Sequence, residues 1–334
     1  MKHDRMMRLA IIGAGAWGTA LAMVARRAGC PVSLWARDPQ IVTAINNKSE
    51  NPFYLPGVML DPAITCTSDL GAAVAAADAA LLVVPAQFLR DVLESLRDHA
   101  PPGFPLLHCA KGIEIGSLAM MSQIGAQILP GSPYAVLSGP SFAAEVARDL
   151  PTAVTIASTD TQLAARFLAA LGSNRFRPYL SSDTVGAEVG GAVKNVVAIA
   201  CGIVVGRGLG DNARAALITR GLAEMVRLGT SQGARAETFR GLSGLGDLVL
   251  SCTATQSRNH ALGLELGRGQ SLDAALACRR TVIEGVATAA AITELAELHK
   301  IEMPICAAVD AVLHRGASID ETADRLLRRP YRSE

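Results

Sequence analysis

Two lysines lie in sequence settings where an ammonium group could act on a carbonyl substrate. Lys194 interrupts the apolar segment "GGAVKNVVAIACGIVVG", a predicted helix that begins at Gly190 and Gly191, and is followed by the polar Asn195. A lysine in such a segment either extends its ammonium to water or lies partly buried, and burial lowers its pKa enough for acid–base catalysis near neutral pH. The adjacent Gly190 and Gly191 favour burial, because small residues let a cofactor approach closely. Lys194 is therefore the candidate for proton transfer.

The second lysine, Lys111, follows the apolar run "LLHCA" and precedes Gly112. If that run is a strand, Lys111 lies at its carboxyl end, where it could hold an anionic substrate or polarise a carbonyl. The simpler alternative is a surface lysine on a loop.

The triplet Ser257-Arg258-Asn259 is suited to binding a phosphate monoester. A guanidinium can donate to two phosphate oxygens at once, and the neighbouring side chains add neutral hydrogen bonds. The alternative is a helix start capped by Ser257, and both interpretations can hold together. Asp247 in "GLGDLVLSCT" and Glu284 at the start of a predicted helix supply carboxylates in the same half of the chain.

Gly13, Gly15 and Gly18 have the spacing G-x-G-x-x-G near the N-terminus. The basic start and the apolar residues 9–25 also resemble a secretory signal peptide. However, a strand at 8–12, a helix that ends at Gly29 and a second strand at 31–37 give the motif the context that dinucleotide binding requires. In that context Gly13 permits a tight turn, Gly15 lets backbone amides approach a pyrophosphate, and Gly18 lets the helix pack closely. We therefore predict a cytoplasmic dinucleotide-binding protein.

Arg37, followed by Asp38, lies at the end of the second predicted strand. An acidic residue there suits the ribose hydroxyl of NAD, whereas an arginine suits the 2′-phosphate of NADP. Arg37 therefore favours NADP(H), and Asp38 leaves NAD(H) open.

Further strands are predicted at "AALLVVPA", ended by Pro85, and at "FPLLHCAKG", "PYAVLSGP" and "TAVTIAS". Strands that alternate with helices predict a Rossmann-type, doubly wound parallel sheet, with ligands beyond the carboxyl ends of its strands. The edge of the sheet formed by the carboxyl ends of its strands then carries residues 85–87, Lys111 and residues 138–141. Pro140 suits the first turn of a helix, which would direct amides near Gly139, Ser141 and Ala143 at a ligand.

Strand patterns fade after "SSDTVGAEVGG" and helical patterns follow. We therefore predict an α/β protein with a dinucleotide-binding domain at 1–188 and an all-helical substrate-binding domain at 189–334. The 31 basic residues nearly balance the 30 acidic ones, so nucleic acid and anionic membranes are not expected as partners. No uninterrupted apolar segment reaches the length of a membrane span. Seven scattered cysteines, none in a Cys-x-x-Cys pair, favour reduced thiols and no metal site.

Eight segments are distinctive and occur in order over nearly the whole chain: "IIGAGAWGTALA", "AKGIE", "SGPSFAAEVA", "GGAVKNVVAIA", "NARAALITRGLAEM", "GLGDLVLSCT", "SRN" and "VIEGV". Through these segments the chain shows a resemblance to the bacterial NAD(P)-dependent glycerol-3-phosphate dehydrogenases. This resemblance implies the reduction of dihydroxyacetone phosphate to sn-glycerol 3-phosphate for phospholipid synthesis.

The resemblance also implies roles for individual residues. Lys194 would transfer the proton, and Lys111, Asp247 and Asn195 would complete the catalytic set. Expected substrate contacts are Lys111, Gly139, Ser141, Lys194, Asp247, Ser257, Arg258 and Asn259. The resemblance, the glycine motif and the position of the sheet edge together give the expected cofactor contacts. These are Gly13, Gly15, Ala16, Trp17, Gly18, Arg37, Pro85, Lys111, Ala143, Arg258, Val282 and Glu284.

The chain departs from the family pattern at Val205 and Arg207, in a loop that tends to be smaller and more acidic, and at His108 and Cys109, where small hydroxyl residues are common. These departures affect loop geometry and cofactor preference. One alternative is a dehydrogenase of the same architecture that acts on a β-hydroxyacid or sugar acid, and another is a non-catalytic dinucleotide sensor. The sequence leaves the oligomeric state open, with a homodimer as an option.

Overall fold

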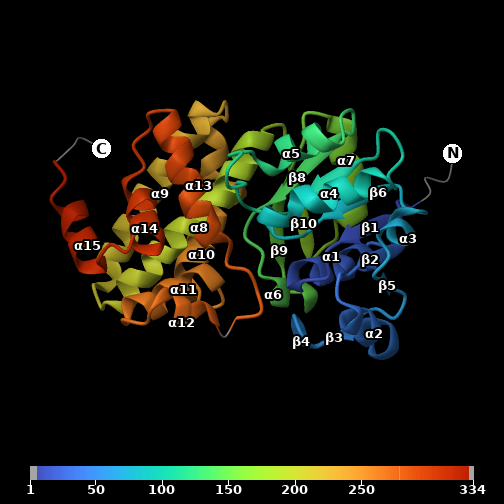
Figure 1. Ribbon diagram of the computed structural model, residues 1–334. Helices are drawn as coiled ribbons and strands as arrows, with labels where there is room; N and C mark the ends of the chain where they lie inside the picture. The colour runs from blue at the N-terminus through green and yellow to red at the C-terminus, as the bar shows by residue number, and fades with distance from the viewer. Residues whose placement is uncertain (1–5, 278, 331–334) are drawn as a thin grey trace. The chain divides into compact units, whose positions relative to one another are not determined.

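The structure is a computed structural model that describes residues 6–277 and 279–330, so Cys278 lies outside the described residues. The described chain forms two compact units (Figure 1). The first takes in the chain up to Lys111 and Met120–Ala187, and the second takes in Gly112–Ala119 and the chain from Glu188. The segment Gly112–Ala119, predicted in the first domain, therefore groups with the second unit.

The first unit is built on one eight-stranded sheet, in the order β10-β9-β8-β7-β6-β1-β2-β5. The chain moves outward from β1 to β2 and β5, and in the opposite direction from β6 to β7 and β8. Each neighbouring pair from β5 to β8 is parallel, so the carboxyl ends of these strands lie at one edge of the sheet. The strands are Leu9–Ile12 (β1), Val32–Trp35 (β2), Thr65–Thr67 (β5), Ala79–Leu82 (β6), Leu106–His108 (β7), Tyr134–Ser138 (β8), Thr152–Ala157 (β9) and Phe176–Ser181 (β10).

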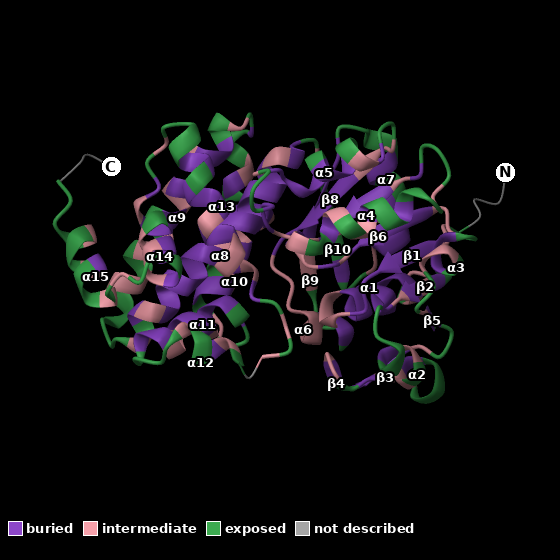
Figure 2. Cartoon of the chain, viewed as in Figure 1, coloured by how far each residue is buried: buried purple, intermediate pink, exposed green. Residues whose placement is uncertain are grey.

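Helices pack on the sheet through their apolar faces, and the sheet lies buried between them (Figure 2). Leu21, Ile45 and Phe167, from three different helices, join Ile11 of β1 in one buried cluster. The helices of this unit are Ala16–Arg27 (α1), Pro39–Lys48 (α2), Leu70–Val74 (α3), Leu89–Arg97 (α4), Met121–Ile128 (α5), Ala143–Ala147 (α6) and Thr161–Leu171 (α7), and a hairpin of Glu50–Asn51 (β3) and Leu55–Met59 (β4) follows α2.

The doubly wound sheet and the helical second half confirm the predicted fold class, but one strand runs the other way. β9 is antiparallel to β8 and parallel to β10. The link from β8 to β9 holds only α6, whose five residues advance about 7.5 Å. Such a helix is too short to carry the chain back along a strand of about 17 Å. The chain therefore turns back, and β9 ends at the opposite edge of the sheet.

Three predicted boundaries were wrong. β6 ends at Leu82, before Pro85. α6 begins at Ala143 with Phe142 as its N-cap, so Pro140 precedes the helix instead of lying in its first turn. The helix that carries Lys194 begins at Thr184, six residues before Gly190, and Asp183 caps it by accepting a hydrogen bond from Gly186 N.

The second unit is helical, and its core is the helix Thr184–Gly206 (α8) from Glu188 onwards, since the first four residues of α8 belong to the first unit. Glycines let α11 lie directly against it, because a Cβ on Gly202 would fall 2.1 Å from the His260 carbonyl oxygen and one on Gly263 would fall 2.0 Å from the Ile199 carbonyl oxygen. This contact fixes the start of α11 relative to α8. The remaining helices are Gly210–Ser231 (α9), Ala236–Arg240 (η2), the π-helical turn Leu242–Gly246 (η3), Asp247–Thr253 (α10), Arg258–Gly267 (α11), Leu272–Ala277 (α12), Glu284–Leu298 (α13), Pro304–His314 (α14) and Ile319–Leu327 (α15).

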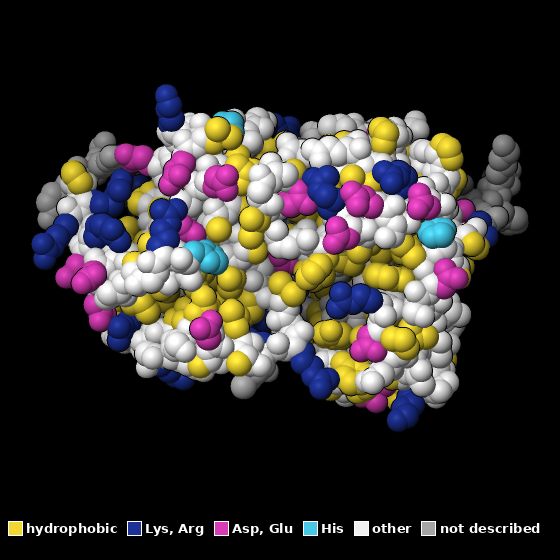
Figure 3. Space-filling model, viewed as in Figure 1, with side chains coloured by type: hydrophobic (Ala, Val, Ile, Leu, Met, Phe, Trp, Pro, Cys, Tyr) yellow, Lys and Arg dark blue, Asp and Glu magenta, His cyan; other side chains and the backbone are white. Residues whose placement is uncertain are grey.

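α8 is long and apolar enough, by length and composition alone, to cross a membrane, a feature that the sequence patterns had not indicated. However, 78% of its most apolar window is buried inside the protein, as in the core helix of a soluble protein. On the face in Figure 3, acidic and basic side chains are intermixed, in keeping with the formal net charge of +1.

Candidate functional site

The glycine motif forms the turn between β1 and α1. Gly13 has φ +119°, and a Cβ there would lie 2.8 Å from the Val83 carbonyl oxygen. A Cβ on Gly18 would lie 1.8 Å from the Gly13 carbonyl oxygen. Both glycines are therefore required by backbone conformation or packing, in the roles that the sequence predicted.

Gly15 differs from the other two glycines, because a Cβ there would have no atom within 4 Å. Its φ of −69° is open to any residue, so neither packing nor conformation explains the glycine. Gly15 is also the N-cap of α1 and offers no side chain to the first-turn amides. Open space beside the first-turn amides of a helix that has no side-chain cap suits an anionic pyrophosphate, so these residues fit a dinucleotide. Ala16 and Trp17 form the first turn beside this space.

Arg37 and Asp38, the second and third residues after β2, have different roles. The Asp38 carboxylate accepts a hydrogen bond from Gln40 N at 2.8 Å and caps α2. Arg37 is exposed. A structural role therefore accounts for Asp38, whereas Arg37 is exposed at the edge of the sheet where the sequence predicted cofactor binding.

Three predicted residues meet where β7 and β8 end. Lys111 Nζ donates to the Gly139 carbonyl oxygen at 2.9 Å, and Ser141 Oγ donates to the same oxygen at 3.0 Å. Gly139 has φ +125°, which favours glycine. The hydrogen bond to Gly139 thus holds the Lys111 ammonium where β7 and β8 end. Pro85 and Ala143 are both partly buried, after β6 and at the start of α6.

The departures at His108 and Cys109 belong to the core of the first unit. Both residues are buried, and the His108 ring meets Tyr134 edge-on at a centroid distance of 5.9 Å. Burial lowers the pKa of His108 to about 4, so its ring is neutral near pH 7. These residues are therefore part of the packing beneath the edge.

In the second unit, Lys194 lies in a buried ion pair. Its Nζ is 3.0 Å from Asp247 Oδ1 and 2.9 Å from Ser251 Oγ. Only 12% of the Lys194 side chain and 2% of the Asp247 side chain are exposed. Ser251 Oγ also donates to Asp247 Oδ1 at 3.3 Å. The ammonium is thus held by two groups from α10 and does not extend into water.

The sequence interpretation missed Ser251. Asp247 and Ser251 are four residues apart on a helix, so they share one face of α10. The neighbouring Cys252 is fully buried, and its contact with Cys201, together with burial, raises its pKa well above the usual value. Its thiol therefore stays neutral, and it supplies no thiolate beside Lys194.

Gly190 serves helix packing and was wrongly interpreted as making room for a cofactor. A Cβ on Gly190 would lie 2.1 Å from the Ser243 carbonyl oxygen in η3. This close contact brings α8 against the turn that leads into α10. Lys194 and Asp247 therefore meet because Gly190 has no side chain.

A second polar cluster connects the starts of α11 and α13. Asn259 Nδ2 donates to Asn195 Oδ1 at 2.8 Å, and Asn259 Oδ1 accepts from Gly285 N at 2.9 Å. Ser257 Oγ accepts from His260 N at 3.3 Å and caps α11, as its alternative interpretation predicted. Asn259 is buried, and among the residues that the structure describes its amide nitrogen donates to Asn195 alone.

Arg258 is the first residue of α11 and is exposed, between the buried Ser257 and Asn259. Partial desolvation lowers the pKa of Arg258 and the nearby Glu284 carboxylate opposes this shift, so the guanidinium remains charged. Glu284 begins α13, as predicted, and Val282 is exposed just before it. The starts of α11 and α13 therefore carry Arg258, Val282 and Glu284 in one part of the second unit.

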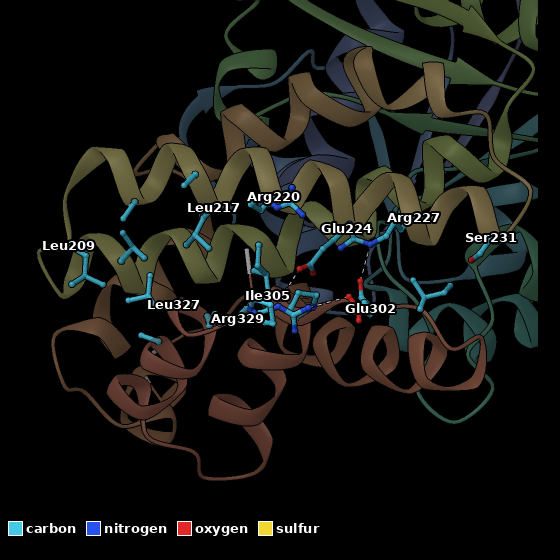
Figure 4. Close-up of a pocket in the computed structure, with 18 of the residues that line it drawn as sticks. Leu209, Leu217, Arg220, Glu224, Arg227, Ser231, Glu302, Ile305, Leu327 and Arg329 are labelled. Carbon is cyan, nitrogen blue, oxygen red and sulfur yellow. Dashed lines mark hydrogen bonds and ion pairs between the residues drawn. The ribbon is translucent and has the colours of Figure 1, made fainter. Parts of the chain in front are cut away.

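A separate groove of about 1300 Å³ runs along α9, between this helix and the segments of α14 and α15. In Figure 4, Leu209 and Leu327 lie at one end, and Arg227 and Glu302 lie towards the other. Glu224 on its wall accepts hydrogen bonds from Ile305 N and Cys306 N, and burial raises its pKa. None of the predicted site residues lines this groove.

Comparisons with known proteins cover nearly the whole chain. Models of the NAD-dependent glycerol-3-phosphate dehydrogenase N-terminus and C-terminus match residues 8–164 and 183–324. A protein of Rhodospirillum rubrum named glycerol-3-phosphate dehydrogenase (NAD(P)+) is 57% identical over 326 residues, which cover 98% of this chain and 93% of the relative. One of the same name from Maricaulis maris is 53% identical, with 98% of each chain covered. The crystal structure of glycerol-3-phosphate dehydrogenase from Coxiella burnetii matches with a TM-score of 0.94 at 40% identity, and covers 97% of this chain and 99% of that chain.

Proposed function

Because the chain belongs to the NAD-dependent glycerol-3-phosphate dehydrogenase family, we propose that it reduces dihydroxyacetone phosphate to sn-glycerol 3-phosphate. The family makes it an oxidoreductase that acts on a CH–OH group with NAD(P). The product has the phosphorylated three-carbon backbone of phospholipids, so we assign the reaction to phospholipid synthesis.

The observation that carries this proposal is the buried ammonium of Lys194 between Asp247 and Ser251. When bound, NAD(P)H supplies the hydride that reduces the carbonyl carbon. Negative charge then develops on the carbonyl oxygen, and Lys194 Nζ donates the proton that completes the alcohol. Asp247 balances the charge of the ammonium, and Ser251 fixes the direction of Nζ. The neutral amine afterwards regains a proton from water.

Arg258 anchors the phosphate of the substrate in this proposal. Arg258 is an exposed residue at the start of α11, and its guanidinium is charged there, where first-turn amides also favour an anion. Asn259 contributes its remaining amide hydrogen, and Ser257 supports the arginine by capping the helix. Asn195 positions Asn259 through the 2.8 Å hydrogen bond. Binding the phosphate away from the reacting carbon helps to orient the carbonyl.

The glycine turn and Arg37 hold the dinucleotide in this proposal. The space beside Gly15 receives the pyrophosphate, and Arg37 binds the 2′-phosphate of NADPH. The Asp38 carboxylate is already a helix cap, which supports a preference for NADPH. Lys111, which donates to the Gly139 carbonyl oxygen, contacts cofactor and substrate in this proposal. Roles for Ala16, Trp17, Pro85, Ser141, Ala143, Val282 and Glu284 stay predictions from the family resemblance.

The direct test is NADPH oxidation at 340 nm with dihydroxyacetone phosphate, compared with unphosphorylated dihydroxyacetone. We expect kcat/KM to fall at least about 100-fold without the phosphate, because hydrogen bonds to a charged group contribute about 1.5–3 kcal/mol each. Equal rates with both ketones, or activity only towards a β-hydroxyacid, would overturn the proposal. We further propose that the enzyme is located in the cytoplasm. It acts on this small substrate either as a monomer or as a homodimer.

A further inference from the structure

Asn51 is a polar residue with no exposed surface in the first unit. It lies in β3, outside the strand–turn–helix segment that carries the glycine motif. Nevertheless, its side chain reaches that motif. Burying an amide in this way is unfavourable unless each polar group is paired, so the contacts of Asn51 show what it does.

The Asn51 amide joins three backbone segments. Its Nδ2 donates to the Ala14 carbonyl oxygen at 2.9 Å and to Thr19 Oγ1 at 2.9 Å. Its Oδ1 accepts from Tyr54 N at 3.3 Å. Both amide hydrogens and the oxygen are thus used, and the hairpin β3–β4 is tied to the turn and to the first turn of α1.

The contact with Ala14 determines the orientation of the next amide. In a trans peptide unit, the carbonyl of one residue and the N–H of the next point in opposite directions. Because the Ala14 carbonyl points at Asn51, the Gly15 N–H points away from it. Among the residues that the structure describes, none accepts a hydrogen bond from Gly15 N. The space beside Gly15 contains no atom within 4 Å of a would-be Cβ.

We propose that Asn51 is a positioning residue for dinucleotide binding: by holding the Ala14 carbonyl, it turns the Gly15 N–H towards the bound pyrophosphate. The inference rests on the proposed cofactor site at the glycine turn. The Ala14 contact alone sets this direction, whereas the contact with Thr19 ties Asn51 to α1 and serves packing. A purely structural residue would stabilise the hairpin without affecting NADPH affinity.

The test is direct NADPH binding by isothermal titration calorimetry to the full-length Asn51→Asp variant. The aspartate keeps the size of the side chain but cannot donate, and its oxygen opposes that of Ala14. We expect the Kd for NADPH to rise about tenfold or more, as for one lost hydrogen bond to a backbone group. In steady state, KM for NADPH should rise similarly, with KM for dihydroxyacetone phosphate within about twofold. An unchanged Kd in a folded variant would overturn the inference.

Two further variants test whether NADPH binding depends on the orientation of the Gly15 N–H or only on the stability of the hairpin. Asn51→Ser removes the reach to Ala14 without adding charge and should weaken NADPH binding in the same way. If Asn51→Asp does not fold, this variant decides, and normal binding by Asn51→Ser refutes the role. Thr19→Val leaves the Ala14 contact intact and should bind NADPH within about threefold of wild type. A loss as large as that of Asn51→Asp would assign the effect to hairpin packing instead.

Ser158→Ala is the matched stability control. Ser158 is buried, donates to the Tyr134 carbonyl oxygen at 2.7 Å, and lies beyond the end of β9, at the opposite edge of the sheet. It should lower the Tm without changing the Kd. If it weakens NADPH binding as much as Asn51→Asp, general destabilisation explains both results and the inference fails.

Gly15→Val tests the underlying site separately, because a Cβ there would have no protein atom within 4 Å. Normal NADPH binding by Gly15→Val would reject the proposed cofactor site itself. Weak binding by Gly15→Val together with normal binding by Asn51→Asp would reject only the role of Asn51.

Discussion

Replacing Asp247 by asparagine removes the negative charge that faces Lys194 without changing the size of the side chain. The two charges are 3.0 Å apart and almost excluded from water. At an effective dielectric constant of about 20, Coulomb's law gives about 5.5 kcal/mol for this separation. Breaking a buried pair by removing one partner costs about 3–5 kcal/mol. Ser251 still holds the ammonium, so we expect the free energy of unfolding to fall by about 3 kcal/mol, and the Tm by about 6–12 °C.

The same substitution should also lower the catalytic rate, in addition to its effect on stability. Without the carboxylate, the ammonium form of Lys194 is destabilised, so less of the proton donor is present as pH rises. We expect kcat for dihydroxyacetone phosphate reduction to fall about 100-fold or more near pH 7.5. The alkaline decline of kcat should also begin at lower pH than in wild type. The assay is NADPH oxidation at saturating substrate across the pH range in which the protein stays folded.

Asp310→Asn is the matched control, because Asp310 is a buried carboxylate in the same unit, paired with Arg315 at 2.9 Å. It should lower the Tm and leave kcat near the wild-type value. The reasoning is refuted if Asp247→Asn keeps kcat within about twofold of wild type, or if the control lowers kcat as strongly.

Three other substitutions test separate parts of the account. Arg258→Ala should raise KM for dihydroxyacetone phosphate by about 10–100-fold through loss of charged hydrogen bonds; a normal KM would reject the phosphate site. Arg37→Ala should lower the NADPH-to-NADH ratio of kcat/KM about tenfold or more, and an unchanged ratio would count against Arg37. Burial holds the pKa of His108 at about 4, below the value of about 6.5 in an unfolded chain. As pH falls from about 6.5 to 4, the unfolded state gains this proton first and up to about 3 kcal/mol of stability is lost. His108→Phe should therefore reduce the fall in Tm over this range, and an equal fall would contradict the assignment.

The sequence predicted the parts of the fold that depend on local patterns. Gly13 and Gly18 stand where backbone conformation or packing excludes a side chain, so their spacing identified the turn between β1 and α1. The direction of β9 could not be predicted in this way, because it depends on how far α6 advances along the sheet. The start of α8 was also missed: Gly190 looked like a helix boundary, although its absent side chain serves a contact with Ser243.

Long-range contacts within the site needed the structure. Lys194 and Asp247 are separated by 53 residues, and only the packing of α8 on η3 brings them together. Ser251 could have been found from its four-residue spacing to Asp247, had the start of α10 been known. Asn51 gave no sequence signal, because an asparagine before a proline resembles any turn residue until its buried contacts are seen.

The most direct test of the central claim is single-turnover NADPH oxidation by Lys194→Met with dihydroxyacetone phosphate, alongside calorimetric NADPH binding. Methionine keeps the length of the side chain and removes the proton that it would donate. We predict that the rate falls about 10²–10⁴-fold while the Kd for NADPH stays within about twofold of wild type. A rate within about threefold of wild type, with the cofactor fully bound, would contradict the assignment of Lys194 as the proton donor.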